Sequence, residues 1–204
     1  PFFMQFFIKK LYNTPMKFLT YSLLLLTYLS ASTLNLSMSS SLSRLNPILA
    51  NDSASSEISD WLFNGLFKYD KNGNPTVELA KSYNFETPTK LIIKLREDVL
   101  WHDNVKLTSK DIIFTYEKII DPKVFNSIKS NFQEVQSVKA LDDYTIEVIY
   151  KNPYFKALET WMVGILPYHL LKDEKDLMTS SFNKNPIGTG SYKIKEFKQG
   201  QDIE

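Results

Sequence analysis

Between residues 91 and 120 the hydrophobic pattern changes from a period of two to a helical period. In Leu91–Leu95 apolar residues alternate with mixed ones, which predicts a strand with one apolar face. Two short apolar runs, at 99–101 and 105–107, then flank His102-Asp103-Asn104. Because Asp and Asn tolerate a positive φ, this pattern predicts a hairpin with these three residues at its tip.

A helix is predicted to follow the hairpin. Thr108 is placed to cap its N-terminus, and Asp111 lies near the positive end of the helix dipole. The helix should end at Asp121-Pro122, since a residue before proline avoids the α region. Helical spacing predicts one buried stripe, made of Ile112, Ile113, Tyr116, Ile119 and Ile120.

The rest of the chain shows shorter periodic segments separated by turn residues. Asp142-Asp143, for example, predicts the turn between two paired strands. The predicted elements are a strand at Thr33–Ser39, a helix at Ser53–Leu66, a strand at Phe67–Asp70 with a turn at Lys71–Pro75, a helical turn at Val77–Tyr83, paired strands at Val135–Leu141 and Tyr144–Tyr150, a helix from Asn152 through Trp161, and a strand at Lys193–Phe197.

Composition narrows the classes of function. Hydrophobic residues make up 43% of the chain and charged residues 23%, which is ordinary for a globular protein. A net charge of +1 gives no reason to expect nucleic acid or an anionic membrane surface as a partner. The sequence has no cysteine, which excludes disulfides, thiolate catalysis and zinc–thiolate sites. It has two histidines, His102 and His169, and a metal site would need more converging ligands than these.

An export signal is predicted at 16–32. Met16-Lys17 provides a positively charged start, Leu19–Leu29 is an apolar run, and Ser30-Ala31-Ser32 supplies small residues for cleavage. The run is short for a membrane span, and a retained membrane anchor is the alternative. With no cysteine behind the run, we expect a free periplasmic protein rather than a lipoprotein. Residues 1–15 lie upstream of this signal, and we assign them no role.

Several stretches, in order along the chain, resemble motifs of one family. The patterns L-D-P, E-G-L, LR-x-G-V-x-W-H-D-G-x-P-[VL]-T-A-x-D and N-P-[VI]-G-[TS]-G-[PA]-Y are typical of extracellular solute-binding proteins of family 5, which serve oligopeptide, dipeptide and nickel uptake. Asparagine replaces the acidic residue of the first two motifs. The similar stretches here are Leu45-Asn46-Pro47, Asn64-Gly65-Leu66, LREDVLWHDNVKLTSKD at 95–111 and NPIGTGSY at 185–192.

The resemblance implies a fold of the α+β or α/β class. It would be the first lobe of a two-lobed, type II periplasmic-binding-protein fold, with a smaller α+β domain inserted into a mixed sheet domain. By analogy, residues 33–63 and 167–204 belong to the main sheet domain, which is incomplete here, and residues 64–166 form the inserted domain. The second lobe, which supplies most of the charged ligand anchors in the family, is expected to lie outside this chain.

The resemblance also implies capture of a ligand without chemistry. A periplasmic monomer would bind a peptide between its lobes, hydrogen-bond its main chain as if it were an added strand, and deliver it to an inner-membrane ABC permease. Closure around the ligand would be a population shift driven by contacts to both lobes. Enzymatic activity and a cofactor are not expected.

Two segments are candidates for ligand contacts from the first lobe. One is the loop Asn51-Asp52-Ser53-Ala54, which follows the position of the family's L-D-P motif; the other is Gly188-Thr189-Gly190. The glycines also suggest a phosphate-binding loop, but the dinucleotide fingerprint needs a helix after them, and here a strand is predicted. For both segments the structural alternative is an ordinary loop or a tight turn.

Three other functions remain open from the sequence. The same fold could bind a nickel chelate, heme or another solute, such as a sugar, instead of a peptide. It could also act as a ligand-sensing module that is not coupled to transport. A secreted hydrolase is the third alternative, although the sequence contains no G-x-S-x-G nucleophile elbow.

Overall fold

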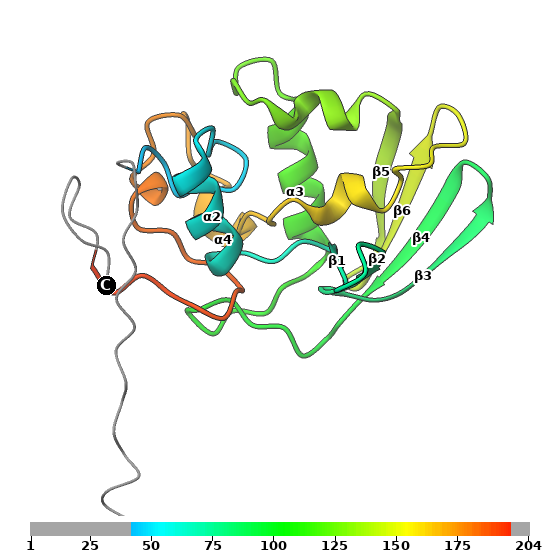
Figure 1. The fold of residues 1–204 in the computed structure, drawn as a ribbon, viewed down its shortest axis with the longest axis horizontal. Helices are drawn as coiled ribbons and strands as arrows, with labels where there is room; N and C mark the ends of the chain where they lie inside the picture. Colours follow the sequence, from blue (N-terminus) through cyan, green and yellow to red (C-terminus); the bar gives the residue numbers. More distant parts are fainter. Residues whose placement is uncertain (1–41, 197–204) are drawn as a thin grey trace, which may run out of the picture. The chain divides into compact units, whose positions relative to one another are not determined.

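The computed structural model of the chain describes residues 42–196. The export signal predicted at 16–32 and the strand predicted at 33–39 lie outside these residues. Within 42–196, none of the helices has the length and apolar character needed to cross a membrane. The elements (Figure 1) are α2 (Ser53–Leu62), β1 (Phe67–Tyr69), β2 (Pro75–Val77), β3 (Ala80–Thr87), β4 (Lys90–Leu95), α3 (Ser109–Ile120), β5 (Val135–Asp142), β6 (Thr145–Tyr150) and α4 (Tyr168–Leu171), with 3₁₀ turns η1 (Ile128–Phe132), η2 (Glu159–Met162) and η3 (Ser181–Asn183).

Four antiparallel strands form a sheet in the order β3-β4-β6-β5. Directly paired residues share a face of the sheet, so Leu91 beside Val148 and Ile93 beside Ile146 build one apolar face. All four side chains are fully buried, whereas Lys94 on the opposite face is exposed. The alternation predicted for 91–95 is therefore confirmed, and so are the two paired strands predicted between 135 and 150.

The predicted hairpin tip is also confirmed. The Trp101 N–H donates to the Val105 carbonyl at 2.8 Å, and the Asn104 N–H donates to the Trp101 carbonyl at 2.8 Å. Asn104 has a φ of 69°, the left-handed conformation that the sequence indicated for this turn. Trp101, the residue just before the tip, is buried and anchors the tip to the core.

Helix α3 begins and ends where the sequence predicts. The Asp111 carboxylate accepts the backbone N–H of Thr108 at 2.8 Å, and the helix ends before Asp121. Ile112 and Ile119 are buried as predicted, but Ile120 is 39% exposed. The buried stripe is rotated because Thr115 faces inward, where its hydroxyl accepts the Leu166 N–H at 2.8 Å.

Two helices predicted from the sequence are shorter than expected. Helix α2 ends at Leu62 instead of Leu66, because the Leu62 carbonyl accepts the Gly190 N–H at 2.8 Å and Gly65 packs against the backbone of Met162. The helix predicted from Asn152 through Trp161 is a series of turns ending in η2. There the Tyr150 hydroxyl donates to the Ala157 carbonyl at 2.6 Å and fixes the compact turn.

Two further predictions at the sheet margins are wrong. Val77–Tyr83 is not a helical turn: β2 ends at Val77 and β3 begins at Ala80, because Tyr83 pairs with Ile93 in the ladder. Leu79 is buried as expected, but Tyr83 is 42% exposed. Residues 193–196, predicted as part of a strand, have no regular structure, since the chain there leaves the end of α2, where the Tyr192 N–H donates to the Trp61 carbonyl at 3.3 Å.

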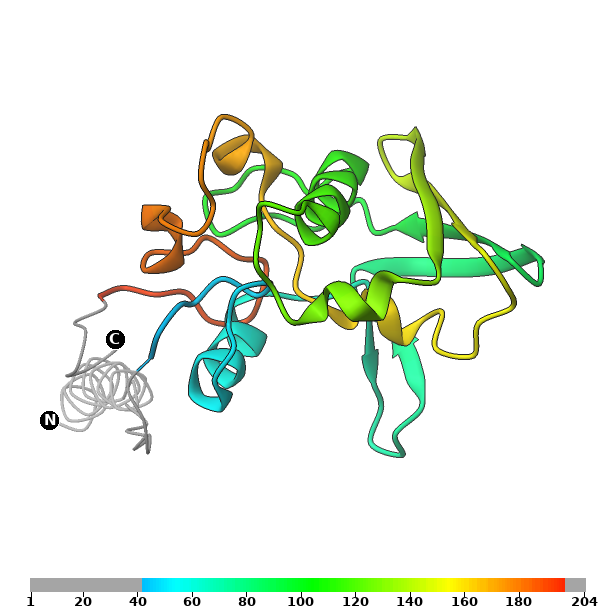
Figure 2. The same ribbon diagram turned by 90° about the horizontal axis from the view of Figure 1, so that it is seen from above.

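The strands of the described residues all lie between 67 and 150, whereas 42–63 and 167–196 contribute α2, α4 and η3. The short β1–β2 pair, antiparallel with Lys68 beside Thr76, points away from the four-stranded sheet (Figure 2). This arrangement matches the α+β class. The proposed boundaries of the main domain at 33–63 and 167–204 and of the inserted domain at 64–166 remain predictions.

Candidate functional site

The loop Asn51–Ala54 leads into α2 and is organised by the carboxylate of Asp52. This carboxylate caps the helix by accepting the Ser55 N–H at 2.8 Å, and it also accepts the Ser43 hydroxyl at 2.5 Å. Burial alone would raise the pKa of Asp52, but these hydrogen bonds outweigh it, and the pKa lies below its usual value. An ionised carboxylate at the positive end of a helix stabilises that end.

The other predicted residues of this loop face different ways. Asn51 and Ser53 are exposed, while Ala54, in the first turn of α2, is buried in the core. The Ser43 hydroxyl lies 3.5 Å from the Asn51 amide oxygen, and the Ser43 N–H donates to the Ser55 hydroxyl at 2.9 Å. The loop is therefore held by Ser43 and Ser55, and it presents the amide of Asn51 and the hydroxyl of Ser53 outward.

The chain before this loop is fixed by a buried asparagine pair. Asn46 is fully buried; its amide nitrogen donates to the Asn183 side-chain oxygen at 3.0 Å, and its own oxygen accepts the Ile48 N–H at 3.1 Å. Asn183 in turn donates to the Leu177 carbonyl at 2.8 Å. An aspartate at position 46 could accept from Ile48 but could not donate to Asn183, so asparagine suits this particular pairing.

The second predicted segment, Gly188-Thr189-Gly190, crosses the C-terminal end of α2. A Cβ on Gly188 would lie 1.8 Å from the Leu62 carbonyl oxygen, and a Cβ on Gly190 would lie 2.2 Å from the Trp61 carbonyl oxygen. Glycine is required at both positions because backbone passes over backbone here. The Thr189 hydroxyl donates to the Asn64 side-chain oxygen at 3.1 Å and ties the segment to the chain after α2.

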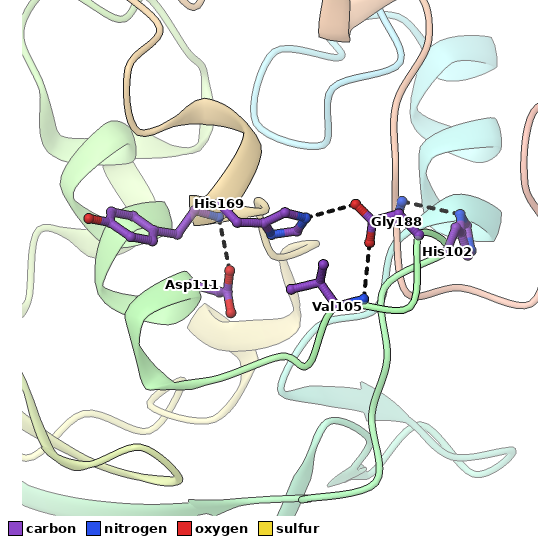
Figure 3. Close-up of polar contacts among 7 residues, drawn as sticks. His102, Val105, Asp111, His169 and Gly188 are labelled. Carbon is purple, nitrogen blue, oxygen red and sulfur yellow. Dashed lines mark hydrogen bonds and ion pairs between the residues drawn. The ribbon is translucent and has the colours of Figure 1, made fainter.

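His102 holds this glycine segment from the other side. Its Nδ1 accepts the Gly188 N–H at 3.2 Å, its Nε2 lies 2.9 Å from the Gly190 carbonyl oxygen, and its backbone N–H donates to the Gly188 carbonyl at 2.9 Å. Figure 3 shows the His102 ring facing Gly188. The backbone polar groups of both glycines are thus engaged within the chain, which supports the tight-turn alternative for this segment.

Asp103, next to His102, and Asp111 tie α4 to the same region. The Asp103 carboxylate pairs with His169 at 2.9 Å, and the Asp111 carboxylate accepts the Tyr168 N–H at 2.9 Å (Figure 3). Burial raises the pKa of Asp111, partly offset by its two backbone hydrogen bonds. For Asp103 the effect of burial is outweighed by the bond from His169, and its pKa is lowered. The hairpin tip is therefore a junction between α4 and the glycine segment.

The two groups of predicted site residues do not come together. Asn51–Ala54 lies at the N-terminal end of α2 and Gly188–Gly190 at its C-terminal end. A helix of 10 residues is about 15 Å long, so the groups are separated by roughly that distance. This separation could not be predicted from the sequence, because it follows from contacts between residues more than 100 positions apart.

A surface cleft of about 440 Å³ opens beside the C-terminal end of α2. Thr189 and Gly190 line it, so one of the predicted groups faces an open space. Two ion pairs border the same cleft, Lys68–Glu78 at 3.2 Å and Arg96–Asp98 at 2.8 Å. Residues 42–196 contain no group of three His, Asp or Glu side chains placed to hold a metal ion.

Comparison with known proteins shows to which protein family the chain belongs. The family described as "Bacterial extracellular solute-binding proteins, family 5 Middle" matches residues 74–204. The chain belongs to this family. The membership predicted from the ordered motifs is thereby confirmed.

Curated relatives of this family 5 chain include peptide-binding proteins. It is 34% identical over 169 residues to the oligopeptide-binding protein AppA of Bacillus subtilis, a match that covers 78% of the chain and 30% of AppA. It is 30% identical over 153 residues to a putative ABC transporter peptide-binding protein of Brucella ovis, covering 71% of the chain and 29% of that protein. The family 5 chain thus spans about a third of the length of these relatives.

Solved structures confirm the fold of the family 5 chain. NikZ from Campylobacter jejuni, in complex with Ni(L-His), aligns with a TM-score of 0.72 and 36% identity over 83% of the chain and 33% of NikZ. AppA from Bacillus subtilis, in complex with a nonapeptide, aligns with a TM-score of 0.73 and 30% identity over 83% of the chain and 34% of AppA. The chain has the fold of the matching part of these solute-binding proteins.

Proposed function

We propose that this chain is part of an exported solute-binding protein that captures peptides for an ABC permease. The observation that carries this proposal is the match to AppA, by sequence at 34% identity and by structure at a TM-score of 0.73, with a nonapeptide bound in that structure. The peptide would lie between this lobe and a second one, and closure would be driven by contacts to both. The protein would be periplasmic and monomeric, carried there by the signal at 16–32.

Binding without catalysis is part of the same proposal. Three carboxylates between Asp98 and Asp111 are already paired: Asp103 with His169, Asp111 with backbone N–H groups, and Asp98 with Arg96. General acid–base catalysis needs a titratable group in reach of substrate, and a group committed to a structural hydrogen bond serves it poorly. The proposed function is therefore binding without a cofactor and without a reacting side chain.

The first-lobe contacts to the peptide are assigned to Asn51–Ala54. Asn51 and Ser53 are exposed, and the Asp52 cap fixes the backbone that carries them. Such a preorganised loop can pair with an extended main chain at little entropic cost. Gly188–Gly190 remains a weaker candidate, supported by the cleft beside Thr189 but opposed by the internal hydrogen bonds of both glycines.

A nickel–histidine chelate is the second candidate ligand. The observation in its favour is the 36% identity to NikZ, whose structure contains Ni(L-His). A chelate brings its own nitrogen and oxygen ligands, so it could be recognised through polar contacts to the organic part. The fold would be unchanged, and only the pocket chemistry would differ from that of a peptide binder.

The proposal is tested by calorimetric titration of the purified protein with a defined peptide mixture and with nickel plus histidine. Asn51→Ala and Ser53→Ala should each weaken peptide binding about 3- to 10-fold, the effect of about one lost polar contact. Asn84→Ala is the matched control, because Asn84 is an exposed asparagine on β3. Peptide affinity unchanged in both loop variants would rule out the assigned loop, and heat released only with nickel–histidine would replace the ligand.

A further inference from the structure

The contacts of His102 define the protonation state of its ring. The backbone N–H of Gly188 can only donate, so the Nδ1 atom 3.2 Å away must be an unprotonated acceptor. The Gly190 carbonyl oxygen can only accept, so the Nε2 atom 2.9 Å away must carry the proton. The two contacts together require the neutral imidazole in its Nε2–H form.

Protonation of this ring would remove one of the two contacts. An imidazolium has an N–H at both nitrogens, and two N–H groups facing one another repel. The Gly188 N–H would then lose its acceptor, while the bond from Nε2 to Gly190 would persist. Gly188 is buried, so its N–H would have no water to replace the lost partner, and an unpaired buried donor is costly.

The glycine segment passes this constraint on to helix α2. The Gly190 N–H donates to the Leu62 carbonyl at 2.8 Å, and Thr189 bonds to Asn64. Both glycines lie so close to the backbone of Trp61 and Leu62 that the segment and the helix end cannot move toward one another. At its other end the same helix carries Asp52 and the loop Asn51–Ala54. A rigid helix of three turns links the two ends.

We propose that His102 is a positioning residue for ligand capture: in its neutral Nε2–H form it fastens Gly188–Gly190 to the end of α2, and its protonation loosens α2 and the ligand loop at the other end. This proposal rests on the proposed binding function of the loop. It predicts that this protein releases its ligand more readily when acidification protonates the His102 imidazole.

Other ionisable groups near the ring can be separated from it. The glycine segment contributes none, whereas the last turn of α2 contributes Asp60, whose pKa is raised by burial and by the nearby Glu78 and Glu57. The hairpin contributes Asp103, and α4 contributes His169, which is paired with Asp103 at 2.9 Å. Since His102 and His169 are the two histidines of the chain, replacing each in turn separates the effects of the two imidazoles, and Asp60→Asn separates that of the carboxyl group on α2.

The protonation state is measured by NMR on the protein labelled with ¹⁵N in histidine and glycine. The neutral form should show an unprotonated Nδ1 and a protonated Nε2 for His102, and the Gly188 amide should shift with the titration of that ring. A protonated Nδ1 at pH 7.5, or a Gly188 amide that does not follow the ring, would overturn the proposal. This readout needs no ligand, so it stays informative if peptide binding itself is not found.

The effect on ligand capture is measured as peptide affinity between pH 5 and 8 in wild-type and two histidine variants. Wild-type and His169→Gln should both lose about fivefold in affinity on acidification, the effect of one neutral hydrogen bond. His102→Asn should bind about fivefold more weakly than wild-type at pH 7.5, because it lacks the Nε2–H that bonds to Gly190, and it should lose the step, because the Asn oxygen can accept the Gly188 N–H at every pH. A step that persists in His102→Asn, or that disappears in His169→Gln, would contradict the assignment. No peptide binding at any pH would refute the proposed function while the NMR result stands.

Discussion

At the scale of single residues, a polar side chain fixes the chain before the loop that leads into α2. In the sequence this side chain was recognisable only as a departure from a family motif. Asn46 replaces the aspartate of the L-D-P pattern, and in the structure its amide donates to Asn183, which an aspartate cannot do. The motif was thus identified correctly, but the partner lies 137 positions away and could not be inferred. The same holds for His102, whose glycine partner lies 86 positions away.

Restoring the family aspartate at position 46 should destabilise this chain. Asn46→Asp places a charge where the side chain is fully buried, beside the Asn183 oxygen, and we expect a loss of about 3 kcal/mol at neutral pH. Burial raises the pKa of the introduced carboxyl, so protonation is favoured by folding; the loss should be smallest at acid pH and grow as pH rises through the folded pKa.

Urea denaturation at pH 4 and pH 7.5 measures this effect. Asn84→Asp, on the exposed strand β3, is the control and should change the free energy of unfolding by less than about 0.5 kcal/mol. Equal stability of Asn46→Asp and wild-type at pH 7.5 would show that the buried amide pair is dispensable.

At the scale of elements, the sequence predicted those whose pattern is local. The strand at 91–95, the hairpin tip and both ends of α3 follow from alternation, turn residues and caps within a few positions. The elements that were mispredicted are those decided by distant partners. Helix α2 stops at Leu62 because Gly190 binds its last turn, and Tyr83 lies in a strand because Ile93 pairs with it.

The crossing of Gly190 over the end of α2 should be sensitive to a single methyl group. In Gly190→Ala the new Cβ would lie 2.2 Å from the Trp61 carbonyl oxygen and 2.6 Å from the Leu62 carbonyl carbon, both backbone atoms. Relief requires the segment or the helix end to move, so we expect a loss of about 2 to 4 kcal/mol in the free energy of unfolding.

Gly73→Ala is the matched comparison for this prediction. Gly73 has a φ of +81° and open space around its Cα, so alanine there costs only the strain of a left-handed backbone, about 1 kcal/mol. In thermal melts, the unfolding midpoint of Gly190→Ala should therefore lie well below that of Gly73→Ala. The reverse order would mean that the crossing is loose and carries no constraint from His102 to α2.

At the scale of the whole molecule, the order of the motifs predicted the family. It did not predict where the two groups of candidate site residues lie relative to one another. The four stretches, in the order in which the family has them, were enough to indicate a family 5 solute-binding protein, and the match over residues 74–204 confirms it. Whether Asn51–Ala54 and Gly188–Gly190 lie together was a question of three-dimensional distance, and they lie at opposite ends of α2. The central claim that remains is capture of a peptide.

Thermal unfolding of the protein with and without a mixture of short peptides tests that claim most directly. A ligand that binds only the folded state raises the midpoint, and at about one hundred times its dissociation constant it adds roughly 2.7 kcal/mol of stability. The account predicts a rise with peptides that Asn84→Ala retains and Asn51→Ala reduces. No rise with peptides, together with a rise on adding nickel and histidine, would contradict peptide capture and make the chelate the ligand.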